Sequence, residues 1–319
     1  MVNLNLEITP AIQAYLIALL FRNTRSTCLG LASLFDNISH DSLNRLLHSD
    51  FPWSRRLWDF FASKMLHSAG WLVVDDTCWQ RYAKSAEAVS KVWSSTAGKV
   101  LLGSQVVLLI WTDGKRKVPL ACRLWEKGGK SKIELASEML REAKQRGIEP
   151  NYVLFDSWYT AKAILQLLDE LEWKYVARIK SNRLFNGKAL NQSWHQRFGQ
   201  GEGKLKGLAH QVKVIKDGKK YLVSNDLQVS PSQMRKEYCR RQQIEETFRL
   251  LKQEFGWENC RARKAKALKA HLHLGLMALC LSQPASESQG QTIYAFKQAL
   301  FRLPIPEQLP FLEHFKSAA

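Results

Sequence analysis

Apolar residues recur at helical spacing through the first part of the chain. The stretches 8–21, 25–35 and 40–49 repeat hydrophobic positions every three to four residues, which predicts a helical N-terminal domain over residues 1–66. A polar break precedes the third helix, for which Ser39 is the expected N-cap. The second and third helices are therefore a candidate helix-turn-helix. It is either a DNA-binding element or plain helix packing, and the pattern leaves both open.

Beyond Gly70 the pattern becomes that of a mixed sheet. An apolar run at 71–74 ends in acids, and residues 103–125 predict two strands joined by a turn at Asp113 and Gly114. A helix, a buried strand, a second helix and a last strand follow, over residues 132–147, 151–156, 159–173 and 174–182. This order predicts an α/β fold whose mixed sheet is flanked by helices, with residues 67–182 as the first part of its core.

The regular alternation of helix and strand stops after this first part of the core. Residues 183–232 are rich in Gly, Lys and Gln, and they contain two strand-like pieces around a turn at Asp217 and Gly218. This composition predicts a β-rich insertion.

The last part of the chain is expected to return to the core. A long helix carrying residues 238–252 belongs to a second part of the core, which spans residues 233–282. Residues 283–292 have the composition of a flexible joint, and the stretch 283–319 is expected to form a C-terminal tail.

Composition narrows the class of protein. Lys and Arg outnumber Asp and Glu by 47 to 29, and this net charge of +18 is spread along most of the chain. The excess favours a polyanionic partner, because Lys and Arg release counterions from phosphates; a basic enzyme of another kind stays open. The six cysteines show neither zinc-binding nor disulfide spacing, and no apolar run suits a signal peptide or a membrane span. We therefore expect a cytoplasmic protein with reduced thiols.

Three acids lie where the predicted elements can bring them together. Asp75 ends one apolar strand, Asp156 ends another, and Glu245 lies on the long helix. Neighbouring strands of one sheet bring their terminal acids close, and a crossing helix can add a third. Carboxylate oxygens suit Mg²⁺ or Mn²⁺, and two such ions can drive displacement at a phosphodiester. Without a metal, the carboxylates would repel one another and one would tend to stay protonated.

Four polar residues of the long helix share one face. The separations between successive members are three, four and seven residues, which are helical steps; the four residues are Tyr238, Arg241, Glu245 and Lys252. A metal-binding Glu would thus be flanked by two cations and a phenol that can hold phosphate oxygens. A surface ladder of salt bridges is the alternative for this face, but it does not account for the acids at the strand ends.

These motifs resemble those of the DDE transposases of bacterial insertion sequences, in particular the group with the Tyr-x2-Arg-x3-Glu-x6-Lys signature. The signature is matched without a gap from Tyr238 to Lys252, and the sequences DDT at 75–77 and VLFDSWYT at 153–160 are also typical of the group. The resemblance covers residues 20–282.

The resemblance implies a ribonuclease-H-like core with Asp75, Asp156 and Glu245 as metal-binding catalytic acids, and with Mg²⁺ or Mn²⁺ as cofactor. It implies a transposase that cuts double-stranded DNA at terminal inverted repeats and joins the ends to target DNA, acting as a homodimer at the bacterial nucleoid. Phosphate contacts are expected from the other three residues of the signature. Arg261 and Arg263 lead a dense basic cluster that is either a further phosphate contact or a solvated charged face.

Several assignments stay open at this level. Asp75 and Asp76 are adjacent, so in a strand only one faces the metals, and the family spacing favours Asp75. Trp194 in the insertion is a candidate for stacking a flipped base, with ordinary packing as the alternative. Two other functions compete with transposition: a metal-dependent nuclease with the same acids, and a DNA-binding protein derived from a transposase that has lost catalysis.

Overall fold

The chain folds into two compact units. The helical unit comprises Met1–Met65, Cys78–Gln105 and Phe248–Ala319, and the sheet unit comprises Leu66–Thr77 and Val106–Thr247. The computed structural model describes residues 9–21, 27–66, 70–83, 85–94, 97–193 and 199–302. Strands β1 and β3 and helix α10 run from one unit into the other.

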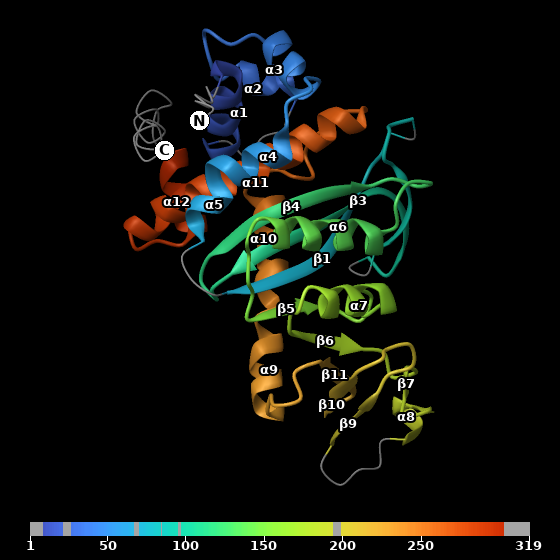
Figure 1. The fold of residues 1–319 in the computed structure, drawn as a ribbon. Coiled ribbons are helices and arrows are strands. Elements are labelled where there is room, and N and C mark those ends of the chain that lie inside the picture. Colours follow the sequence, from blue (N-terminus) through green and yellow to red (C-terminus); the bar gives the residue numbers. More distant parts are fainter. Residues whose placement is uncertain are drawn as a thin grey trace. The chain divides into compact units, whose positions relative to one another are not determined.

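The helical unit is built around two apolar helices. Its helices are α1 (Pro10–Phe21), α2 (Cys28–Ala32), α3 (His40–Leu47), α4 (Trp53–Leu57), the π-helical turn η1 (Trp58–Ala62), α5 (Ser63–Met65), α11 (Ala265–Ser288) and α12 (Ile293–Phe301). Helix α1 is buried over most of its surface and packs on α11, as Figure 1 shows in blue and orange. This burial explains why both helices lack a broad polar face.

The N-terminal helices confirm the prediction made from periodicity. Helix α2 contacts α3, and Ser39 caps α3 by accepting a hydrogen bond from the Ser42 backbone N–H at 3.1 Å. Whether this helix pair binds DNA stays a prediction.

The flexible joint predicted for residues 283–292 is wrong over its first part. Helix α11 continues to Ser288 with Pro284 inside it. Gln283 and Ser286 are buried, and the Ser286 hydroxyl donates to the Gln283 carbonyl at 2.9 Å. Burial of the helix on its neighbours outweighs the cost of an internal proline, which is about 3 kcal/mol.

The chain also forms a nine-stranded mixed sheet, which confirms the predicted α/β class. Its strands are β1 (Trp71–Gln80), β2 (Ser90–Ser94), β3 (Lys99–Thr112), β4 (Lys117–Trp125), β5 (Tyr152–Phe155), β6 (Tyr175–Ile179), β9 (Gln200–Lys204), β10 (Gln211–Asp217) and β11 (Lys220–Ser224). They follow the order β2-β3-β1-β5-β6-β11-β10-β9, with β4 also paired to β3. Strands β1, β5 and β6 are parallel, while β6, β11, β10 and β9 are antiparallel.

Helices flank the strands of the sheet unit (Figure 1). They are α6 (Lys132–Gln145), α7 (Lys162–Glu170), α8 (Leu190–Ser193), α9 (Pro231–Cys239) and the first half of α10 (Gln242–Gln253). Helix α6 packs on β4 and against α7, and α9 packs on β5, β6 and β11. The central strand β5 therefore needs an almost wholly apolar sequence, because parallel strands are covered on both faces.

The predicted hairpins are present. The strands β3 and β4 meet at Asp113 and Gly114, where the Asp113 carboxylate accepts the backbone N–H groups of Lys115 and Arg116, both at 2.8 Å. Gly114 has a φ of 99°, a conformation that favours glycine.

The second hairpin joins the segment 183–232 to the main sheet. Strands β10 and β11 pair through Asp217 and Lys220, and β11 continues the sheet by pairing with β6. Strands β7 (Leu184–Phe185) and β8 (Lys188–Ala189) form a separate small sheet. Trp194 lies outside the described residues, and the domain boundaries proposed from the sequence stay a prediction.

Candidate active site

The strand register brings the first two acids together. In the parallel pair of β1 and β5, Val74 lies opposite Phe155, so that Asp75 and Asp156 are the next residues of two adjacent strands. The prediction that the first strand ends at the acids is wrong, because β1 continues to Gln80. It is β5 that ends there, at Phe155. The prediction that Asp75 and Asp156 lie next to each other on adjacent strands, where β5 ends, is confirmed.

The carboxyl group of Asp75 is held in an unfavourable setting for a charge. Its side chain is only 16% exposed. Burial raises the pKa of Asp75 to about 7; the Arg241 guanidinium opposes this shift, while the charges of Asp156 and Asp76 add to it. Because like charges raise each other's pKa only when they are close, this shift marks Asp75 and Asp156 as one electrostatic group.

The signature segment is not one continuous helix. Helix α9 ends at Cys239 and α10 begins at Gln242. Between them the backbone N–H groups of Arg240 and Arg241 bond three residues back instead of four, to Glu237 and Tyr238, both at 3.0 Å. The single helix expected from the spacing is therefore wrong at this point.

Tertiary contacts of the two arginines accompany this tightened turn. The Arg240 guanidinium lies 3.7 Å from the centroid of the Trp71 ring and forms an ion pair with Glu237 at 3.4 Å. Arg241 pairs with Asp75. Helical spacing alone does not encode these contacts, so the sequence pattern could not reveal the break.

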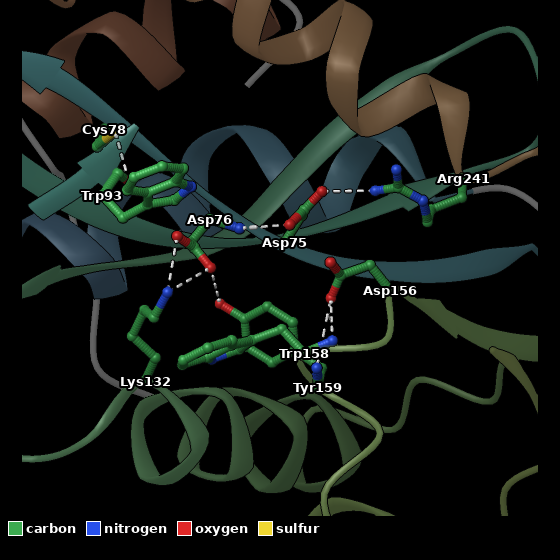
Figure 2. Close-up of polar contacts among 9 residues, drawn as sticks. All are labelled: Asp75, Asp76, Cys78, Trp93, Lys132, Asp156, Trp158, Tyr159 and Arg241. Carbon is green, nitrogen blue, oxygen red and sulfur yellow. Dashed lines mark hydrogen bonds and ion pairs between the residues drawn. The ribbon is translucent and has the colours of Figure 1, made fainter. Parts of the chain in front are cut away.

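Arg241 links the first and third acids. One guanidinium nitrogen, Nη1, lies 2.5 Å from Asp75 Oδ2, and the other, Nη2, lies 2.5 Å from Glu245 Oε1. Figure 2 shows the Asp75 side of this bridge, with Asp156 facing the same group. Burial would lower the pKa of Arg241, but the carboxylate of Asp75 and other negative groups raise it above its usual value. The guanidinium is thus a fixed positive charge among the acids.

Tyr238 lies beside two guanidinium groups. Its ring centroid is 5.9 Å from the Arg178 guanidinium carbon and 6.0 Å from that of Arg241. Burial raises the pKa of its phenol. Among the described residues its buried hydroxyl has no hydrogen-bond partner. A buried hydroxyl without a partner is costly, so this group is available to donate to a ligand.

Asp76 is engaged in a different way from Asp75. Lys132 Nζ lies 3.0 and 3.1 Å from its two carboxylate oxygens, and the Tyr159 hydroxyl donates to Oδ1 at 2.8 Å (Figure 2). Burial, followed by the charge of Asp76, raises the pKa of the Tyr159 phenol. The negative charge of Asp76 is therefore already compensated by a cation and a hydroxyl donor.

The donor set suits a hard divalent cation in its chemistry. Asp75, Asp156 and Glu245 supply only carboxylate oxygens, the donors that Mg²⁺ and Mn²⁺ prefer. Over the described ranges, no three His, Cys, Asp or Glu side chains are arranged to hold a metal ion. Asp75 and Glu245 both contact the Arg241 guanidinium instead. The residues fit the cation, provided that Arg241 releases them.

The remaining residues of the predicted DNA-binding set lie in the helical unit. Lys252 Nζ donates to the Cys78 carbonyl at 3.0 Å and pairs with Glu258 at 2.7 Å. Arg261 and Arg263 are exposed, and no ion pair is found for either guanidinium within the part of the chain that the structure describes. Their contacts with DNA stay a prediction.

Sequence reasoning missed the residue that anchors this basic loop. The buried Arg81 guanidinium donates to the backbone carbonyls of Cys260 and Ala262, both at 2.5 Å. These bonds fix the loop from inside, so Arg261 and Arg263 can keep their side chains outside. A single Arg at the end of a strand gives no periodic signal that would have identified it.

A second group missed by sequence reasoning follows Asp156. The Asp156 carboxylate accepts the backbone N–H of Trp158 at 2.8 Å and that of Tyr159 at 3.4 Å. Tyr159 in turn reaches Asp76, and Lys132 lies beside the Trp158 ring (Figure 2). The sequence motif at 153–160 indicates the second acid, but it gives no sign that its aromatic residues also belong to this region.

Comparison with known proteins identifies a family for most of the chain. A family model described as "DDE superfamily endonuclease" matches residues 9–238, which include the first two acids and end before Arg241 and Glu245. No curated protein matches the chain. None of the helices in the described ranges is long and apolar enough to cross a membrane.

The chain also matches solved structures. The piggyBac transposase in a synaptic complex with hairpin DNA is 15% identical, with a TM-score of 0.53 over 94% of this chain and 72% of that chain. The NurA nuclease from Sulfolobus solfataricus is 9% identical, with a TM-score of 0.30 over 63% of this chain and 84% of that chain. A Mos1 mariner paired end complex with Mn is 12% identical, with a TM-score of 0.22 over 88% of this chain and 79% of that chain. The likeness to piggyBac transposase supports the ribonuclease-H-like fold.

Proposed function

The chain belongs to the DDE superfamily endonucleases, and we propose that it is a DNA transposase of a bacterial insertion sequence. It cuts double-stranded DNA at the terminal inverted repeats of its own element and joins the freed ends to target DNA. The proposal is supported by the placement of three acids: Asp75 and Asp156 directly follow the paired residues Val74 and Phe155 of β1 and β5, and Arg241 forms ion pairs with both Asp75 and Glu245.

Asp75, Asp156 and Glu245 are the proposed catalytic and metal-binding residues. These carboxylates would hold Mg²⁺, with Mn²⁺ as a substitute, and the bound ion would supply activation of a water or a 3′-hydroxyl and stabilisation of the leaving oxygen. Asp75 is preferred to Asp76 as the first acid, because Asp76 is already compensated by Lys132 and Tyr159. The raised pKa of Asp75, about 7, fits a carboxylate that gains from a nearby cation.

The proposed reaction has two steps at phosphorus. In the first, a water oxygen attacks the phosphodiester at the element's end, the bond from phosphorus to the 3′-oxygen breaks, and a free 3′-hydroxyl remains. In the second, this hydroxyl attacks a phosphodiester of the target and displaces its 3′-oxygen. No covalent bond to the protein forms in either step.

Side chains of the signature are proposed to hold the DNA. The Arg241 guanidinium, which now binds two carboxylates, has the donor geometry to grip two phosphate oxygens instead. The unpartnered hydroxyl of Tyr238 donates to a phosphate oxygen nearby. Lys252, Arg261 and Arg263 bind phosphates from the helical unit.

Two further features of the proposal rest on the family resemblance. A homodimer is expected on DNA, because two ends of one element must be handled together. The enzyme is expected to act in the cytoplasm at the nucleoid, where the net charge of +18 favours association with DNA.

A metal-dependent nuclease on the same fold is the second candidate. The family description names an endonuclease, and cleavage needs only the first of the two steps. Such an enzyme would cut the repeat and would not join it to a target.

The test uses a labelled duplex carrying the element's terminal repeat, a target duplex and Mg²⁺. Wild type is expected to give cleaved and joined products, and Glu245→Gln is expected to give neither. Glu246→Gln is the matched control, since the neighbouring Glu246 pairs with Lys117 at 3.2 Å and takes no part in the proposed site. Cleavage without joining would favour the nuclease, and activity of Glu245→Gln would refute the assigned site.

A further inference from the structure

Trp158 is exposed beside the second acid. Its side chain is 54% exposed, whereas the next residue, Tyr159, is 1% exposed. Trp158 follows Asp156 by two residues, and its backbone N–H donates to the Asp156 carboxylate at 2.8 Å. The indole is therefore exposed on the segment that directly follows a proposed metal-binding residue, and in Figure 2 its ring extends towards Lys132.

The turn that carries Trp158 is fixed by hydrogen bonds at both ends. Thr160 Oγ1 donates to the carbonyls of Asp156 at 3.1 Å and Arg178 at 2.5 Å. The Tyr159 hydroxyl donates to Asp76 at 2.8 Å. The exposure of the indole does not come from a loosely attached loop, because the residues on either side of it are anchored.

Two ammonium groups lie at the indole ring. Lys132 Nζ is 4.5 Å from the ring centroid, and Lys180 Nζ is 5.5 Å from it. Lys132 is also held by Asp76, with only 16% of its side chain exposed. Lys180 follows β6 and is exposed, and no carboxylate pairs with it among the residues described. One cation thus fixes the ring, and the other is available to an incoming anion.

This combination matches the chemistry of a nucleotide. A rigid indole offers a flat surface on which any base can stack, and an unpaired lysine beside it can bind the phosphate of the same residue. A base within a duplex has both faces covered by its neighbours, so only an unpaired base can stack on the protein. Exposed cation–π contacts contribute only about 0.5 to 1 kcal/mol, too little to explain an unburied Trp.

We propose that Trp158, Lys132 and Lys180, which we name the Trp158 platform, bind an unpaired nucleotide of the DNA strand whose phosphate is cut at Asp75 and Asp156. The base stacks on Trp158, Lys180 binds the adjoining phosphate, and Lys132 holds the plane of the ring. This inference rests on the proposed function, because it requires DNA at the same acids.

Binding is measured by fluorescence anisotropy with two labelled duplexes, one blunt and one with unpaired nucleotides at its end. Both are tested against Glu245→Gln protein, so that no cleavage occurs and no metal is needed. Trp158→Ala is expected to weaken binding of the duplex with unpaired nucleotides about tenfold or more and to leave the blunt duplex within about twofold. Trp158→Phe should restore most of the loss, because a phenyl ring also stacks.

A matched control comes from the helical unit. Trp93 is 62% exposed on β2, and Trp93→Ala is expected to bind both duplexes as the parent does. The fluorescence of a 2-aminopurine base in the unpaired segment should be quenched when the Glu245→Gln parent binds. With Trp158→Ala added to this parent, the quenching should be lost. Equal loss for both duplexes, or no loss for either, would overturn the proposal.

The outcome of this binding experiment does not depend on whether the protein joins DNA ends. If the selective loss is seen while wild type fails to join DNA ends, the platform stands and the transposase function fails. If joining is observed and Trp158→Ala shows no selectivity, the transposase function stands and the platform fails.

Discussion

Two groups of buried ionisable side chains, one in each unit, are held in opposite ways. In the helical unit the Tyr15 hydroxyl donates to His271 Nδ1 at 2.9 Å, and His271 Nε2 donates to the Gly256 carbonyl at 3.1 Å. Because a carbonyl can only accept, these bonds fix the tautomer of His271 with its proton on Nε2. Lys297 donates to the carbonyls of Leu19 and Glu254.

The cluster of the helical unit is closed on itself. Burial lowers the pKa of His271 to about 4, so the ring is neutral at pH 7. Burial also lowers the pKa of Lys297 to about 8. Every group has an acceptor or donor inside the unit, which is the arrangement expected of a polar network that stabilises packing.

The acid group of the sheet unit is left incomplete. Asp75 and Asp156 are like charges on neighbouring strands, and the single guanidinium of Arg241 is shared between Asp75 and Glu245. Tyr238 keeps a buried hydroxyl without a partner in the described part of the chain. The comparison teaches that a satisfied polar cluster stabilises the fold, whereas an accumulation of like charges costs stability and is typical of a functional site.

The largest expected effect separates activity from stability. Asp75→Asn should reduce DNA cleavage by about 10³-fold or more, equivalent to about 4 kcal/mol in the activation barrier, because a proposed metal ligand is removed. Its free energy of unfolding at pH 7.5, measured with urea, should be no lower than that of wild type, since a buried charge beside Asp156 is lost.

Tyr15→Phe provides the converse variant. Removing the hydroxyl leaves His271 Nδ1 without its donor and should lower the free energy of unfolding by about 1 to 3 kcal/mol, with cleavage retained. If Asp75→Asn were strongly destabilising and Tyr15→Phe inactive, the distinction between the two clusters would fail.

The next effect concerns pH and the helical unit. The folded pKa of His271, about 4, lies below its ordinary value of 6.5, so the unfolded chain binds more protons between these values. The associated stability is fully present above pH 6.5 and is lost as pH falls towards 4. The total loss in free energy of unfolding from this one residue is about 3 kcal/mol.

Denaturation of wild type and His271→Gln over this pH range measures the contribution. The difference in free energy of unfolding between the two proteins should shrink as the pH falls from 6.5 to 4. A constant difference would show that His271 does not titrate as its burial requires, because the carboxylates common to both proteins cancel in the comparison.

The smallest expected effect sharpens the role of Arg241. Arg241→Gln frees Asp75 and Glu245 from the guanidinium and should tighten Mn²⁺ binding about tenfold, or roughly 1.4 kcal/mol, in the absence of DNA. Titration followed by electron paramagnetic resonance of free Mn²⁺ measures this affinity without any cleavage assay.

Arg240→Gln is the matched control for the Mn²⁺ titration. The guanidinium of Arg240 stacks on Trp71 and pairs with Glu237, and it is not bound to Asp75 or Glu245. Arg240→Gln should therefore leave the Mn²⁺ affinity unchanged. Weaker Mn²⁺ binding by Arg241→Gln would contradict competition between the guanidinium and the cation for the same carboxylates.

Local patterns in the sequence predicted most of the elements. The position of Ser39 before an apolar helix predicts its role as an N-cap, and turn chemistry predicts the hairpin at Asp113 and Gly114. These features depend on interactions between residues that are close in the sequence. The two parallel strands at Asp75 and Asp156 also carry their own signal, in the form of apolar runs that precede an acid.

Features that depend on distant contacts escaped prediction. The turn at Arg240 and Arg241 accompanies contacts with Trp71 and Asp75, which lie far away in the sequence. Helix α11 continues through Pro284 because its packing outweighs the local break. Lys180 gives no signal of its own, and only the fold brings it to Trp158.

The sequence by itself determined the mixed α/β fold and which three acids to examine, because periodicity and strand-terminal acids are local properties. Only the tertiary structure decided how those acids are compensated: Arg241 bridges Asp75 and Glu245, while Lys132 and Tyr159 take up Asp76. The physical reason is that charge compensation depends on distances of a few ångströms between side chains. Residue spacing does not encode such distances when the partners come from different strands and helices.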